Sequence, residues 1–141
     1  MKKSGISVLY FLAFALIMSL LGLTGCSANK LSSDFNEEDV KKAAENVIVL
    51  INKEDSKSLR EIFNPRLNEA LTDEVMNQVY DAIRQGGQFE KVQSMSVVGS
   101  TDKSTNEEFA VVVAVAKYAN RSFTYTLSFD KQMKLAGLYY K

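Results

Sequence analysis

Apolar residues in the part of the chain after residue 36 recur with the period of an α-helix. Val40, Ala44, Val47, Ile48 and Ile51 are spaced by three and four, which predicts a helix over about residues 37–52. Asn36 can cap this helix, and acidic residues 37–39 suit its positive end. Three further helical segments are predicted: one begun by Asp55 or Ser56 and ended by Asn64-Pro65, a turn over 66–71, and one begun by Thr72 and ended by Gly86-Gly87.

After Gly87 the period changes from helical to two, which is typical of β-strands. The clearest alternation places Phe123, Tyr125, Leu127 and Phe129 on one side of a strand, and we expect that side to pack on the helices. The predicted strands are Phe89–Val98, Glu107–Tyr118, 123–129 and Lys134–Tyr140, and the turns between them are Gly99–Asn106, Ala119-Asn120 and Asp130–Met133. Short connections indicate an antiparallel meander. The predicted fold is therefore α+β, with N-terminal helices packed on a curved four-stranded meander.

The second predicted strand is apolar on both sides between Phe109 and Ala116, so alternation alone does not orient it. If Phe109, Val111, Val113 and Val115 face the core, then Ala110, Val112, Ala114 and Ala116 point the other way. That outer surface would be flat and mildly apolar, and it is a candidate interface for a homodimer or a protein partner. Its residues would be Val112, Ala114, Ala116, Thr124 and Thr126. The alternative is a partly solvated face, or one covered by the segment before the domain.

The first 26 residues have the features of a secretory signal. Lys2 and Lys3 form a positive start, and the stretch from Ile6 to Leu23 is mostly apolar. Leu23-Thr24-Gly25-Cys26 resembles the bacterial lipobox, which implies a diacylglyceryl group on Cys26 and removal of residues 1–25 as a signal peptide. An uncleaved transmembrane helix is the alternative, because the apolar stretch is about long enough to span a bilayer. The glycine break and the polar residues that follow Cys26 favour the lipobox.

The lipobox predicts both the domain organisation and the location. Residues 26–36 would be the lipidated Cys and a short polar, flexible tether, and 37–141 the folded domain. The protein would be anchored to the cell membrane through lipid on Cys26 and would face outside the cytoplasm. The sequence leaves the envelope type open.

Composition limits the available chemistry. The chain has no His and one Cys, Cys26, which removes Ser–His and Cys–His nucleophiles, ordinary zinc sites and any disulfide within the chain. Loss of Lys2 and Lys3 leaves 17 − 2 = 15 basic against 17 acidic residues, a formal charge of −2. This balance argues against a nucleic-acid partner. We predict no metal, no cofactor and no catalytic residue.

Three groups of side chains are the candidates for a site. Aromatic residues could line a cavity between helices and sheet, although filling the core with Tyr hydroxyls at its rim is the simpler interpretation. The aromatic candidates are Tyr80, Phe109, Phe123, Tyr125, Phe129 and Tyr139. Asp81 could be a general base, but a surface ion pair with Arg84 is the simpler explanation. Acidic residues 37–39 could bind calcium, but the start of a helix explains them and they lack the spacing of a calcium loop.

Three features point to a known superfamily. The chain has helices before a curved meander, an aromatic strand that alternates with Thr and Ser, and a last strand containing Lys134-Leu135-Ala136-Gly137-Leu138. This order resembles the nuclear transport factor two-like (cone-shaped α+β) superfamily. More narrowly, residues 38–141 resemble a small uncharacterised domain of Gram-positive lipoproteins, which also precedes α/β-hydrolase domains.

The resemblance implies either a non-catalytic binding or dimerising module, or a cavity enzyme. The superfamily's isomerases use an Asp base with a Tyr and a second acid, and this motif has no counterpart that we can place here. Two hypotheses follow for function. The first is a non-catalytic binding or interaction module of the cell envelope. The second is a small-molecule-binding protein or enzyme with a cavity between helices and sheet.

Overall fold

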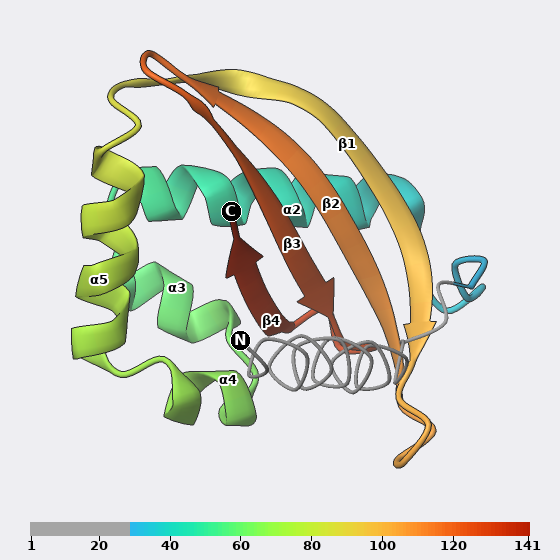
Figure 1. Ribbon diagram of the computed structural model, residues 1–141. Helices are drawn as coiled ribbons and strands as arrows, with labels where there is room; N and C mark the ends of the chain where they lie inside the picture. Colours follow the sequence, from blue (N-terminus) through green and yellow to red (C-terminus); the bar gives the residue numbers. More distant parts are fainter. Residues whose placement is uncertain (1–28) are drawn as a thin grey trace, which may run out of the picture.

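The computed structural model describes residues 29–141, which form helices followed by one sheet (Figure 1). The predicted signal peptide and Cys26 lie outside the described residues. In chain order the helices are α2 (Glu37–Asn52), α3 (Ser56–Ile62), α4 (Pro65–Ala70) and α5 (Asp73–Arg84). The strands are β1 (Phe89–Thr101), β2 (Glu108–Tyr118), β3 (Ser122–Phe129) and β4 (Leu135–Tyr140). No helix among residues 29–141 is long and apolar enough to cross a membrane.

Each helix begins at a side chain that accepts hydrogen bonds from the first backbone N–H groups. Asn36 accepts from Glu38 and Asp39 at the start of α2, as predicted. The corresponding caps of α3, α4 and α5 are Asp55, Asn64 and Thr72. After α5 the chain turns at Gly87, whose φ of +80° lies in the left-handed region that favours glycine.

The strands pair in sequence order, β1-β2-β3-β4, and every pair is antiparallel. The α+β class and the meander predicted from the sequence are confirmed. One strand boundary was wrong, because β1 continues to Thr101 and includes Gly99, which was predicted to lie in a turn. The polar turn is shorter and is held by Asp102, whose carboxylate accepts hydrogen bonds from Ser104 and Thr105.

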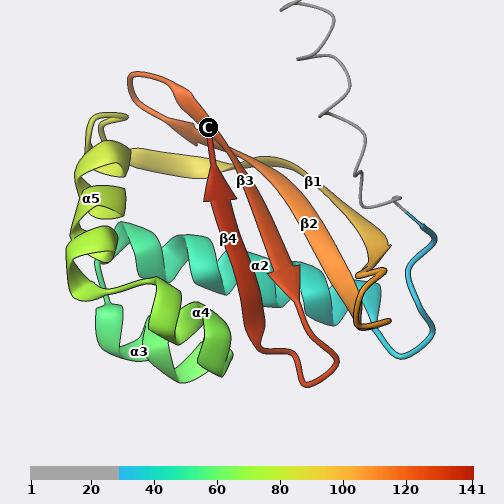
Figure 2. The same cartoon turned by 60° about the horizontal axis from the view of Figure 1, so that its bottom comes forward.

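The helices cover one face of the curved sheet and leave the other face open (Figure 2). Helix α2 lies across β1 and β2, while α3, α4 and α5 lie together toward β4. The core between these layers contains the predicted apolar side of β3, which is Phe123, Tyr125, Leu127 and Phe129. Each of these four residues is at most 3 % exposed. The prediction that this side packs on the helices is confirmed.

The predicted orientation of β2 was wrong. Ala110, Val112, Ala114 and Ala116 are fully buried on the helix side, whereas Val113 is 36 % exposed on the outer side. The reason is the register with β3, in which Ala114 lies opposite Tyr125 and Ala116 opposite Phe123. Directly opposed residues share a face of the sheet. Small alanines on the buried face leave volume for the aromatic rings and allow α2 to approach closely.

This reversal divides the predicted partner surface between two faces. Val112, Ala114 and Ala116 lie in the core, and Thr124 and Thr126 lie on the outer face opposite Val115 and Val113. The five residues therefore form no common surface. The outer face of the sheet is instead formed by residues from all four strands: Val98, Phe109, Val111, Val113, Val115, Thr124, Thr126, Ser128, Gly137 and Tyr139.

The segment before α2 is held against the domain, so the prediction of a flexible tether is wrong for residues 29–36. Asn29 pairs with Gly99 through two backbone hydrogen bonds of 2.8 and 2.7 Å. Phe35 is buried in the core, and Leu31 packs against it. We call residues 29–35 the N-terminal clasp.

Candidate functional site

The structure does not bring the six aromatic candidates together around one cavity. Tyr80, Phe123, Tyr125 and Phe129 are buried core residues. Phe109 and Tyr139 lie on the outer face of the sheet, and Tyr139 is 61 % exposed. The reversed orientation of β2 accounts for the misplacement of Phe109.

A chain of hydrogen bonds crosses the core at the end of α2. The Asn52 side chain donates to the Tyr118 hydroxyl at 3.0 Å, and the hydroxyls of Tyr118 and Tyr125 are 2.7 Å apart. Burial raises the pKa of both phenols above the ordinary value, and the contact with Tyr118 raises that of Tyr125 further. Within residues 29–141 no buried side-chain polar atom lacks a hydrogen-bond partner. These hydroxyls therefore satisfy one another within the core.

A small pocket of about 310 Å³ opens at this end of the core, between α2, α5 and the start of β1. Asn52, Tyr80 and Phe89 contribute to its lining. Arg84 and Glu54 form a 2.6 Å ion pair that also borders it. The Tyr80 hydroxyl is already bonded to Ser56 at 2.8 Å.

Asp81 does not face the core. Its side chain is 64 % exposed and forms a 2.8 Å ion pair with Arg84, as the sequence predicted. The acidic residues at the start of α2 are explained by the helix, since Asn36 caps that turn and Glu37 pairs with Lys41. No cluster of metal-ligating side chains occurs among the residues that the structure describes.

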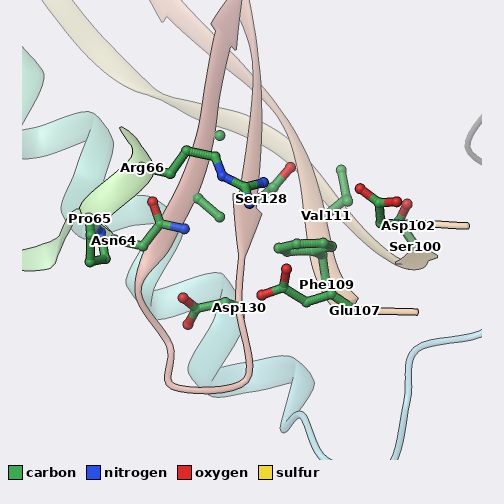
Figure 3. A pocket seen from close by; sticks show the side chains of 12 residues that line it. Asn64, Pro65, Arg66, Ser100, Asp102, Glu107, Phe109, Val111, Ser128 and Asp130 are labelled. Carbon is green, nitrogen blue, oxygen red and sulfur yellow. The ribbon is translucent and has the colours of Figure 1, made fainter. Parts of the chain in front are cut away.

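A hollow on the outer face of the sheet was not predicted (Figure 3). It has a volume of about 450 Å³, within the range of ligand-binding pockets, although it is open to solvent. We call it the outer groove. Phe109 and Val111 from β2 form its apolar part, with Ser128 and Gly137 beside them.

The walls of the outer groove carry opposite charges. Arg66, near the start of α4, extends its guanidinium over Ser128 (Figure 3). This guanidinium makes no hydrogen bond or ion pair within residues 29–141, but its charge is one of the causes that lower the pKa of Asp102 across the groove. Asp102 and Glu107, at the two ends of the β1–β2 turn, stand at the other side. Hydrogen bonds from Ser104 and Thr105 lower the pKa of Asp102, which keeps this carboxylate charged.

Asp130 also borders the outer groove but has a structural role. It is 6 % exposed, and its carboxylate accepts hydrogen bonds from the backbone N–H groups of Gln132 and Lys134. These bonds hold the β3–β4 turn, which the sequence predicted at this position. Arg66, Asp102 and Glu107 are therefore the charged groups of the groove that could contact a ligand.

One pattern in the sequence indicates this groove. Its residues come from three separate parts of the chain, so no local motif contains them. The alternation of small and large residues from Phe109 to Ala116 was visible, however, and assigning the smaller set to the core would have placed Phe109 and Val111 outside.

The fold and the groove define a class of protein: a small α+β domain with an antiparallel sheet that is covered by helices on one face only. The chain belongs to a family of proteins of unknown function (DUF3887), whose model matches residues 44–138. A solved structure with the same fold is the NMR structure of a protein from Ruminococcus gnavus ATCC 29149. It is 24 % identical, with a TM-score of 0.70, and the match covers 79 % of this chain and 96 % of that one. A search of curated proteins found no match.

Proposed function

We propose that the protein is a lipid-anchored binding module of the cell envelope that holds a peptide segment of a protein partner in the outer groove. The observation that carries the proposal is the groove itself. Phe109 and Val111 offer an apolar surface beside the Arg66 guanidinium, with the acidic groups of Asp102 and Glu107 opposite. An extended peptide with an acidic residue next to apolar ones complements this arrangement.

Two sequence features support the location and the superfamily. Leu23-Thr24-Gly25-Cys26 fits a lipobox, and the lipid would fix the protein outside the cytoplasm. Two acyl chains suffice for stable anchoring, since each buried CH₂ contributes about 0.8 kcal/mol. The order of helices and curved meander supports a relation to the nuclear transport factor two-like superfamily, which includes non-catalytic binding modules.

The anchor is tested by Cys26→Ser in a bacterial host that processes lipoproteins. We expect the wild type to lose residues 1–25, to incorporate labelled fatty acid and to sediment with membranes. The variant should remain unprocessed and unlabelled. Normal maturation of Cys26→Ser would refute the anchor.

The groove is tested with Arg66→Glu, because charge reversal replaces attraction for an acidic peptide by repulsion. Isotope-labelled protein is titrated with a panel of extended peptides in which one Asp or Glu lies between apolar residues. The amide signals of Phe109, Val111 and Gly137 should shift. Arg66→Glu should weaken binding about tenfold or more, which corresponds to at least about 1.4 kcal/mol.

The matched control is Lys91→Glu, which reverses an exposed charge on the edge strand β1, outside the groove. It should bind the same peptides as the wild type does. If both substitutions weaken peptide binding equally, the loss of affinity comes from the change in net charge and not from the groove. The groove proposal fails if no peptide in the panel shifts these amides.

The pocket beside Asn52 and Tyr80 supports a second candidate function, the binding of a small molecule between helices and sheet. The same titration separates the two candidates. Signals from Tyr80, Ile83 and Phe89 would respond to a ligand in that pocket, whereas those of Phe109 and Val111 respond to one in the outer groove.

A further inference from the structure

We propose that the N-terminal clasp orients the domain on the membrane, with the β1–β2 turn next to the lipid headgroups and the β2–β3 turn held away from them. The inference rests on the proposed lipidation of Cys26. It adds which surface of the domain the bilayer contacts.

The clasp is fixed by close backbone contact at Gly99. Asn29 and Gly99 exchange two hydrogen bonds, and the Lys30 carbonyl lies so close to the Gly99 Cα that a side chain would collide with it. Only glycine allows this approach of two backbones.

Further contacts hold the rest of the clasp at the same end of the sheet. Lys131, in the β3–β4 turn, pairs with Asp34 at 2.8 Å and with Glu108 at 2.7 Å. Such exposed ion pairs contribute little to stability. Phe35 contributes more to the stability of the clasp, because it is buried in the core and only 7 % exposed.

Little chain remains between the clasp and the anchor. Cys26 precedes Asn29 by three residues. Because an extended chain spans at most about 3.6 Å per residue, the Cα atoms of Cys26 and Asn29 are within roughly 11 Å of each other. Gly99, which is paired with Asn29, must therefore lie near the headgroups, together with the adjoining turn that contains Lys103.

The opposite end of the sheet is out of reach of the anchor. β2 has 11 residues and separates the turn at Lys103 from the turn at Asn120. At roughly 3.4 Å per residue this distance is on the order of 35 Å. The formal charge of −2 after residue 25 gives the rest of the domain no electrostatic attraction to an anionic leaflet. We therefore expect an upright domain.

This orientation also places the outer groove. Ser100, Asp102 and Glu107 line the groove at the end that faces the bilayer. A peptide that enters there would come from close to the membrane surface, so the matching partner is itself membrane-bound and offers a juxtamembrane segment.

The test uses the full lipoprotein in vesicles of phosphatidylethanolamine and phosphatidylglycerol. Lipid on Cys26 consumes the chain's one thiol, so a fluorophore can be placed singly at Lys103→Cys or Asn120→Cys. Both positions are exposed turn residues. Nitroxide-labelled headgroups should quench the label at 103 several-fold more strongly than the label at 120. Equal quenching would overturn the proposal.

Two controls separate the clasp from other causes. An insertion of about ten Gly and Ser residues between Ala28 and Asn29 frees the domain and should remove the difference in quenching. Gly99→Val should do the same by displacing the clasp. If the insertion leaves the difference in quenching between positions 103 and 120 unchanged, the surface of the domain sets the orientation and the clasp does not. Mass spectrometry of the N-terminal peptide is the separate check on lipidation; an unmodified Cys26 would refute the anchor and this inference with it.

Discussion

Ala114→Asp should unfold most of the domain, whereas Val113→Asp, one residue away, should leave it folded. Ala114 is fully buried in the core opposite Tyr125, whose hydroxyl is already bonded to that of Tyr118. An unpaired carboxylate in such a site costs several kcal/mol, a large part of the roughly 5–15 kcal/mol by which a domain is stable. Val113 is 36 % exposed on the outer face, so its carboxylate stays in water. We expect a cost of about 1 kcal/mol there.

The pair of substitutions is matched, because both introduce Asp into the middle of β2. Urea unfolding followed by circular dichroism, on a soluble form that begins at Ser27, gives the two free energies of unfolding. The opposite ranking, with Ala114→Asp tolerated and Val113→Asp unfolded, would restore the orientation of β2 that alternation first suggested.

Stability should fall steeply above pH 10 because of the buried phenols of Tyr118 and Tyr125. Burial raises the pKa of Tyr118 and Tyr125 in the folded protein, and an unfolded Tyr ionises near pH 10. Above that pH the unfolded state releases protons that the folded state keeps, so the free energy of unfolding decreases as pH rises. Each proton that the folded state retains contributes on the order of 1 kcal/mol per pH unit in this range. Below pH 10 the stabilisation is fully present.

Comparison of variants separates the contribution of Tyr118 and Tyr125 to the pH dependence of stability from the contribution of other groups that titrate at high pH. Tyr125→Phe should remove about half of the Tyr-dependent slope, since Tyr118 still accepts the Asn52 hydrogen bond. Tyr139→Phe removes an exposed phenol and should leave the slope as in the wild type. Urea unfolding at several pH values from 9 to 11 measures both. Identical slopes for Tyr125→Phe and the wild type would contradict the assignment.

The core is occupied by its own aromatic rings, with Tyr118 in edge-to-face contact with Phe89 and Phe123. The charged side chains of Arg66, Asp102 and Glu107 line the outer groove, beside the apolar surface of β2. This contrast favours recognition on the outer face of the sheet.

The order of the helices and strands, and their bounds apart from the end of β1, could be predicted from the amino-acid pattern alone. Local signals suffice for these features: Asn36 and Thr72 begin their helices, and the alternation from Phe123 to Phe129 orients β3. Short turns then leave little choice other than an antiparallel meander. The α+β class follows from that order.

Only the tertiary structure decided which side of β2 is buried, where the groove lies and how the N-terminal segment is held. β2 is apolar on both faces, so its orientation depends on pairing with β3 and on the volume needed by the aromatic rings. The groove joins Arg66 to residues more than thirty positions away. The clasp depends on the contact of Asn29 with Gly99, which is 70 residues distant in the chain. Contacts between residues so far apart in the chain produce no periodic pattern in the sequence. Side-chain volume and strand register decide which of these residues meet when the layers pack.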